Sequence, residues 1–193
     1  MKNIILFGKP GAGKGTQAAL LRDAFQLVHI STGDLFRYNI SNNTSLGILA
    51  KSFMDRGDLV PDEVTIKMLE AEVDVNPDAG GFIFDGFPRT AKQAKALDDF
   101  LHGEEMSIQA TIALDVDEEI LIKRLLKRGK DSGRADDQDE EKIRNRFEEY
   151  NNKTAPLINY YKTQNKFHSI KGVGTVTEIS KQLIALLDTL KND

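Results

Sequence analysis

The sequence contains no cysteine, which excludes disulfide bonds and the common structural zinc sites that use cysteine ligands. The lack of cysteine does not indicate whether the protein works in an oxidising or a reducing compartment. An excess of positive charge is missing as well, since the formal net charge is −4. A general nucleic-acid or membrane-surface binder is therefore not expected, and any anion site must concentrate positive charge locally.

Long hydrophobic runs are also absent. The apolar run NIILF (3–7) is soon followed by Gly8 and Pro10, so it is too short for a signal peptide or a membrane span. We therefore expect a cytoplasmic protein. What remains is an ordinary globular composition, with 40% hydrophobic and 29% charged residues, and 193 residues are enough for one domain with a sizeable core.

Short apolar runs recur along the chain and are typical of strands buried on both faces. They cover residues 3–7, 82–85, 108–116, 166–170 and, as a weaker candidate, 27–30. Helical patterns cover residues 14–25, 34–40, 45–56, 62–73, 90–102, 118–128, 139–164 and 176–191. This alternation predicts an α/β fold in which helices flank a parallel five-stranded sheet and the crossovers are right-handed.

Two segments depart from this alternation. Residues 31–60 hold short helices and are longer than a simple crossover requires, which predicts a small helical excursion. The Gly-rich, strongly charged segment 128–141 is typical of a mobile surface loop between two helices.

The stretch GKPGAGKGT (8–16) is typical of a phosphate-binding loop (P-loop), because a predicted strand precedes it and a predicted helix follows it. Gly8, Gly11 and Gly13 can adopt positive φ and let backbone N–H groups approach an anion. A helix that begins near Lys14 points its positive end at the same place, and the lysine adds a full charge. The loop predicts binding of nucleotide phosphates but leaves the reaction open.

The position after the loop lysine is unusual, because Gly15 stands where a P-loop normally has Ser or Thr, and Thr16 follows one position later. A Mg²⁺ contact would therefore come from Thr16 or through water. Asp85 ends the predicted strand 82–85 and has the form of a metal-orienting acid, with an ordinary turn acid as the alternative. We expect Mg²⁺ to be held through water near Thr16 and Asp85.

Six of the nine arginines stand at positions suited to binding phosphates, which arginine does with planar, permanently charged donors. These six are Arg37, Arg89, Arg124, Arg128, Arg134 and Arg146. Arg124 and Arg128 are four residues apart and share one helix face. Arg144 and Arg146 are two residues apart, so we expect only one of them to point into a cleft.

An ordered set of motifs resembles the adenylate kinase family across nearly the whole chain. The motifs are GKPGAGKGT (8–16), STGDLFR (31–37), GDLVPDE (57–63), FDGFPRTAKQA (84–94), RLLKRG (124–129) and GRADD (133–137). In that family Gly-Thr is the usual form after the P-loop lysine. The resemblance implies one core domain, residues 1–193, with a nucleoside-monophosphate-binding region at 31–60 and a short, zinc-free lid at 127–137.

The resemblance also implies the reaction MgATP + AMP ⇌ 2 ADP, with Mg²⁺ as cofactor, and roles for individual residues. The implied ATP site consists of Gly11, Ala12, Gly13, Lys14, Gly15, Thr16, Arg124, Arg128 and Gly174. The implied AMP site consists of Thr32, Arg37, Asp58, Leu59, Val60, Gly86, Phe87, Pro88, Arg89, Gln93, Arg134 and Arg146. The implied catalytic groups are Lys14, Arg89, Arg128, Arg134 and Arg146, with Asp136 and Asp137 orienting the lid arginines.

Two other functions remain as alternatives. A UMP or CMP kinase is the nearest, and Thr32 and Gln93 favour the adenylate branch over it. A non-catalytic nucleotide switch fits less well, because it would not need two sets of phosphate-binding arginines. We expect the partners to be ATP, AMP and ADP, with no nucleic acid and no membrane, and we expect a monomer.

Local alternatives remain at two places. Ser31 and Asp34 fit a helix-capping box, so a purely structural role is possible for both. One extra residue near Asp139, relative to the family pattern, leaves open whether Arg144 or Arg146 faces the cleft.

Overall fold

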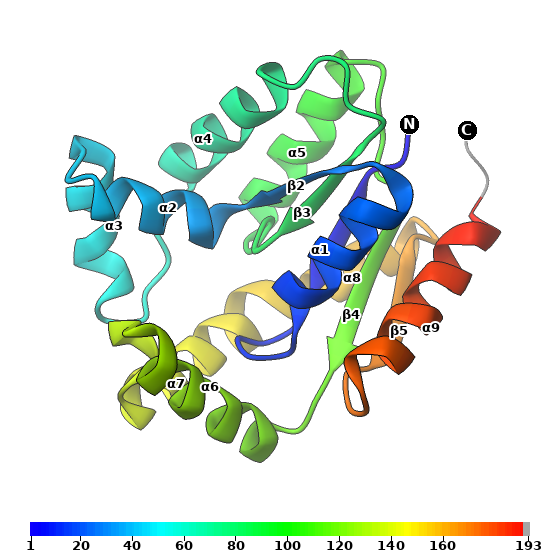
Figure 1. The fold of residues 1–193 in the computed structure, drawn as a ribbon. Coiled ribbons are helices and arrows are strands. Elements are labelled where there is room, and N and C mark those ends of the chain that lie inside the picture. The colour runs from blue at the N-terminus through cyan, green and yellow to red at the C-terminus, as the bar shows by residue number, and fades with distance from the viewer. Residues whose placement is uncertain (191–193) are drawn as a thin grey trace.

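The computed structural model describes residues 1–190, in which a parallel sheet is covered by helices on both faces (Figure 1). Its strands are β1 (Ile4–Phe7), β2 (Val28–Ser31), β3 (Phe82–Asp85), β4 (Ala110–Asp115) and β5 (Phe167–Lys171). The strand order is β2-β3-β1-β4-β5, and all neighbouring pairs are parallel. The α/β fold predicted from the sequence is confirmed, including the weaker strand candidate at 27–30.

The helices also follow the sequence pattern closely. They are α1 (Lys14–Phe25), α2 (Thr32–Ser41), α3 (Ser45–Met54), α4 (Asp62–Asp74), α5 (Ala91–Gly103), α6 (Glu118–Ser132), α7 (Glu140–Glu149), α8 (Leu157–Thr163) and α9 (Val176–Thr189). A 3₁₀ turn spans Ala135–Asp137 and a π-helical turn spans Tyr150–Thr154. Within residues 1–190 no helix combines the length and apolar character needed to cross a membrane.

The hydrophobic core has one layer on each side of the sheet. Ile4 and Leu6 of β1 contribute to the layer under α1, α6, α7 and α9. Ile5 and Phe7, which point to the opposite face because side chains alternate along a strand, contribute to the layer under α4, α5 and α8. Burial on both faces explains why β1 is apolar throughout.

A third, smaller apolar cluster lies in the helical excursion. Phe36 of α2, Ala50 of α3 and Val60 are its buried members. Figure 1 shows α2 and α3 projecting beyond the sheet, on the side where α6 and α7 also lie. The excursion thus packs around apolar residues of its own.

Two predictions about the second half of the chain were partly wrong. The expected surface loop 128–141 is helical up to Ser132, where α6 ends at Gly133 with a φ of 68°. Gly129 is a packing residue, because a Cβ there would lie 2.7 Å from the backbone oxygen of Asp137. The expected helix 139–164 is divided into α7 and α8 by the π-helical turn, and Pro156 is the N-cap of α8.

The segments that follow three neighbouring strands meet at one edge of the sheet. The glycine-rich loop follows β1, Thr32 follows β2 and Gly86 follows β3. Because the strands are parallel, their carboxyl ends share one edge, which is where open α/β sheets bind ligands. The topology therefore brings the motifs of the first half of the chain to one place.

Candidate active site

The loop between β1 and α1 has the backbone conformation expected of a phosphate cradle. Gly8, Gly11 and Gly13 have φ angles of 142°, 84° and 98°, which L side chains rarely adopt. Gly13 is the N-cap of α1, and no side chain caps this helix end. The first backbone N–H groups of α1 are thus left for an anion at the positive end of the helix.

Lys14, the first residue of α1, folds back over this loop. Its Nζ donates a hydrogen bond to the Gly8 oxygen at 2.8 Å. Burial lowers the pKa of Lys14 to about 8; the carboxylate of Asp85 opposes this shift, and Arg89 and Arg146 add to it. A phosphate beside the ammonium group would favour its charged form and raise this pKa again.

Two adjoining cavities meet at Lys14. The first, named here the Thr32 cavity, has an empty volume of about 950 Å³, and the second, the P-loop cavity, about 1920 Å³. Four cationic side chains line both cavities: Lys14, Arg37, Arg89 and Arg146. Positive charge is therefore concentrated where the two cavities join, in a protein whose net charge is negative.

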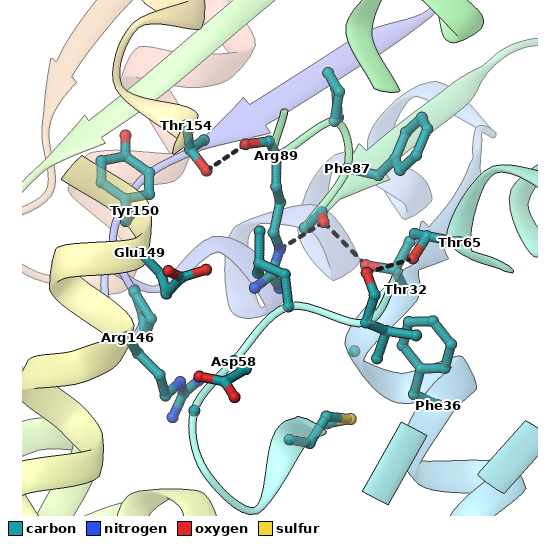
Figure 2. A pocket seen from close by; sticks show the side chains of 18 of the residues that line it. Thr32, Phe36, Asp58, Thr65, Phe87, Arg89, Arg146, Glu149, Tyr150 and Thr154 are labelled. Atoms are coloured by element: carbon teal, nitrogen blue, oxygen red, sulfur yellow. Dashed lines mark hydrogen bonds between the residues drawn. The ribbon is translucent and has the colours of Figure 1, made fainter. Parts of the chain in front are cut away.

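The Thr32 cavity has a hydrogen-bonded wall around Gly86 (Figure 2). The Gly86 oxygen accepts hydrogen bonds from Thr32 Oγ1 at 3.0 Å and from Arg89 Nε at 2.7 Å. A Cβ at Gly86 would lie 2.9 Å from Thr32 Oγ1, so this close approach requires glycine. Burial lowers the pKa of Arg89 to about 10, and the charge of Arg146 contributes to this shift.

Gln93, near the start of α5, belongs to the same wall and is only 2% exposed. Its Oε1 accepts the backbone N–H of Arg89 at 2.7 Å, and its Nε2 donates to Asp62 Oδ1 at 2.8 Å. The other carboxylate oxygen of Asp62 accepts from Thr90 Oγ1 at 3.0 Å. Sequence reasoning missed Asp62, which stands inside the quoted motif GDLVPDE but carries no local signal of contact with Gln93.

The turn before α4 rests on α7. The Asp58 carboxylate accepts from Arg56 Nε at 2.8 Å and from Asn145 Nδ2 at 3.3 Å. Asn145 Nδ2 also donates to the backbone oxygen of Arg56 at 2.8 Å. Asp58, Leu59, Val60, Phe87 and Pro88, all predicted from the resemblance, line the Thr32 cavity.

A fully buried carboxylate orients the arginines of the predicted lid. Asp137 accepts from Arg128 at 2.6 and 3.1 Å and from Arg146 Nη1 at 2.7 Å. Burial raises the pKa of Asp137, but its bonds with these arginines outweigh that effect and lower it overall. The orienting role that the resemblance implied for Asp137 agrees with these contacts.

The structure separates the two neighbouring arginines of α7. Arg146 is 14% exposed and lines both cavities, and its Nη1 lies 3.0 Å from Asp136 Oδ2. Arg144 is 51% exposed and pairs with Glu140 at 2.7 Å. Arg146 is therefore the one of this pair that faces the cleft.

The helical excursion and the predicted lid meet at Asp34. Its Oδ1 lies 2.6 Å from Arg37 Nη2 and 3.5 Å from Arg134 Nη2. Arg134 lines the P-loop cavity rather than the Thr32 cavity, so the geometry does not place it in the AMP site that the resemblance implied. Ser31 caps α2 by accepting the Asp34 backbone N–H, as its structural alternative predicts, and it also lines the P-loop cavity.

One arginine of α6 and two glycines near the start of α9 also line the P-loop cavity. Arg124 donates to the Gly172 oxygen at 3.3 and 3.4 Å. Arg124, Gly172 and Gly174 all line this cavity. The predicted ATP residues from Gly11 to Thr16 line it as well.

Two oxygen-bearing residues of the P-loop cavity suit Mg²⁺. Thr16 and Asp85 line the cavity, and Gly15 lies beside the Asp85 carboxylate, with its ideal Cβ position 3.7 Å from Oδ2. Burial raises the pKa of Asp85, but nearby His29 and Lys14 outweigh it, so the pKa is lowered and the carboxylate stays ionised. Within residues 1–190 no cluster of three or more His, Cys, Asp or Glu could hold a metal directly. Thr16 and Asp85 thus offer a hydroxyl and a carboxylate oxygen to such an ion.

A glycine-rich loop between a parallel strand and a helix, with a lysine and converging arginines, defines a P-loop nucleotide-binding protein of the α/β class. The family model described as Adenylate kinase matches residues 6–166. The chain belongs to the adenylate kinase family, which confirms the resemblance seen in its motifs.

Individual relatives agree with this family over almost the full chain. The chain is 64% identical to the adenylate kinase of Flavobacterium psychrophilum over 190 residues, covering 98% of this chain and 100% of the relative. It is 61% identical to that of Flavobacterium johnsoniae, with the same coverage. It is 47% identical to that of Bacteroides fragilis, again over 98% of this chain and 100% of the relative.

Proposed function

We propose that this chain transfers the terminal phosphoryl group of MgATP reversibly to AMP, giving two ADP. The observation that carries this proposal is that Lys14, Arg37, Arg89 and Arg146 line both cavities. Two nucleotides that bind in the two cavities would meet with their phosphates at these cations. The relatives named adenylate kinase support the same function.

On the donor side, we assign the ATP phosphates to the loop from Gly11 to Thr16, with Lys14 next to the transferred group. Arg128 and Arg134 would bind the phosphates from the opposite wall, and Arg124 with Gly174 would lie against the base. Mg²⁺, placed through water by Thr16 and Asp85, would neutralise charge on the phosphates.

On the acceptor side, we assign the α-phosphate of AMP to Arg37 and Arg89. Thr32, Val60 and Gln93 would bind the base. The attacking group is an ionised phosphate, so the reaction needs no general base. Catalysis would come from holding the two phosphates in line and from stabilising charge with Lys14 and the arginines.

We further propose that segments 31–60 and 127–137 close over the two nucleotides and keep water out of the reaction. Water would otherwise accept the phosphoryl group and turn the enzyme into an ATPase. The approach of Arg134 to Asp34 at 3.5 Å supports such a closure, because it joins the two segments directly.

The test is to incubate the purified protein with MgATP and with AMP, GMP, CMP or UMP in turn, and to follow diphosphate formation by phosphorus NMR. We expect AMP to be the best acceptor and to yield ADP alone. Preferential turnover of CMP or UMP would overturn the proposal in favour of a pyrimidine nucleotide kinase.

A further inference from the structure

Asp62 is the centre of a closed hydrogen-bond network behind the Thr32 cavity. One of its oxygens accepts from Gln93 Nε2 and the other accepts from Thr90 Oγ1. Thr90 is the N-cap of α5 and in turn accepts the backbone N–H of Gln93 at 3.2 Å. The network joins the first turn of α4 to the first turn of α5.

This network determines the orientation of the Gln93 amide. A backbone N–H can only donate a hydrogen bond and an ionised carboxylate can only accept one, whereas the two ends of an amide do either. The Arg89 N–H therefore requires the oxygen of Gln93 on its side, and Asp62 requires the nitrogen on the other. In a flipped amide, the Gln93 nitrogen would face the Arg89 N–H, donor against donor. The Gln93 oxygen would face the Asp62 carboxylate, acceptor against acceptor.

The fixed amide offers a defined pattern to a ligand. Gln93 lines the Thr32 cavity, and its Nε2 retains one N–H beyond the bond to Asp62. A hydrogen-bond donor at this place suits a base with an unprotonated ring nitrogen, such as adenine. It opposes a base with an N–H at that ring position, such as hypoxanthine.

We propose that Asp62 is a specificity-determining positioning residue, which holds the Gln93 amide in the orientation that selects a 6-aminopurine monophosphate. This role rests on the proposed function, since it assigns the acceptor nucleotide to the Thr32 cavity. Asp62 acts through Gln93 and is not itself among the residues that line the cavity.

The neighbouring residue provides a matched control. Glu63 also lies in the first turn of α4, so loss of its charge weakens the interaction with the helix dipole in the same way. Its side chain is 65% exposed and pairs with Lys92, and neither of these residues lines the Thr32 cavity. Asp62→Ala and Asp62→Asn are therefore compared with Glu63→Ala and Glu63→Gln.

The quantity to measure is the ratio of kcat/KM for AMP to kcat/KM for IMP, with ATP saturating. We expect Asp62→Ala to lower this ratio about tenfold, because the amide, then oriented by the Arg89 N–H alone, can turn its oxygen toward the N–H of hypoxanthine at a smaller cost. Asp62→Asn keeps an oxygen that accepts from Gln93 Nε2, and its amide nitrogen can donate to Thr90 Oγ1, which then accepts, so this variant should retain the ratio. Both Glu63 variants should also retain it, and the KM for ATP should stay unchanged in all four.

Several results would overturn the proposal: an unchanged ratio in Asp62→Ala, an equal loss in Asp62→Asn, or an equal loss in the Glu63 variants. Should Asp62→Ala fail to fold in a thermal unfolding assay, Asp62→Ser replaces it, because serine stays polar but is too short to reach Gln93. The wild-type assay separates this inference from the proposed function. If wild-type protein forms no ADP from ATP and AMP, the proposed function fails whatever Asp62 does.

Discussion

The two cavities that share Lys14 are lined by different kinds of chemical groups. The Thr32 cavity has apolar walls, including Phe36, Val60 and Phe87, and the polar Gln93 in its wall is held in place by hydrogen bonds to Arg89 and Asp62. The P-loop cavity is lined mainly by glycine backbone and arginines. A preformed pattern of donors and acceptors distinguishes bases, whereas cations and N–H groups bind phosphate charge of any nucleotide.

The difference indicates where the selectivity of the enzyme resides. We infer that the acceptor base is chosen strictly at the Thr32 cavity and that the donor is bound chiefly through its phosphates. The following predictions run from the largest expected effect to the smallest. Each concerns one of the two cavities or the place where they join.

The largest effect is expected at the boundary. Arg89→Ala removes a buried cation that lines both cavities, and we expect turnover to fall roughly 10³-fold, the scale of an arginine that stabilises phosphoryl transfer. Steady-state ADP formation measures this loss. Arg22→Ala is the matched control, because Arg22 is exposed and pairs with its neighbour Asp23. Normal turnover in Arg89→Ala would show that Arg89 does not stabilise the transferred phosphoryl group.

Removing the buried carboxylate of Asp137 should affect both ATP binding in the P-loop cavity and the stability of the fold. Asp137→Asn removes the negative charge that Arg128 and Arg146 share, and we expect the free energy of unfolding to fall by roughly 3 kcal/mol. Denaturant unfolding gives this value, with Asp131→Asn at the exposed end of α6 as control. ATP should restore stability in Asp137→Asn more than in the wild type, since its phosphates pair with the same arginines. An equal ATP effect in both proteins would argue against this arrangement.

A smaller effect should appear with pH. The free enzyme loses the proton of Lys14 as the pH rises through about 8, because burial lowers that pKa. We expect kcat/KM for ATP to fall above that pH, approaching tenfold per pH unit. Bound phosphates raise the pKa of Lys14, so the decline in kcat should begin at a higher pH.

The pH profiles of kcat and kcat/KM measure this difference directly. In Lys14→Arg the decline near pH 8 should disappear, even though the variant is less active. A decline that stays at the same pH in this variant would assign it to another group.

The smallest effect is expected where the excursion rests on α7. Asn145→Ala removes the bonds to the Arg56 oxygen and to Asp58, and we expect KM for AMP to rise about threefold, as for the loss of one net hydrogen bond. KM for ATP should not change, because the P-loop cavity does not include this turn. The adjacent Arg144→Ala serves as control. A rise in both KM values would mean that Asn145 acts on the whole site.

The sequence by itself determined the features that depend on residues close together in the chain. The strands were predicted by apolar runs, and the phosphate loop was predicted by glycines whose φ angles the structure confirms. Such features depend on backbone conformation and on burial, and both leave a local pattern in composition. The resemblance to the family motifs then predicted roles for arginines that are far apart in the chain.

Only the tertiary structure decided which of these groups meet. Asp62 and Gln93 are 31 residues apart, and their contact depends on how α4 packs beside α5. The rotational position of α7 decides that Arg146 faces the cavities and Arg144 faces solvent. Gly129 looked like part of a loop because its real constraint, the backbone of Asp137, comes from another turn of the chain. These pairings depend on packing between elements, which no short stretch of sequence encodes.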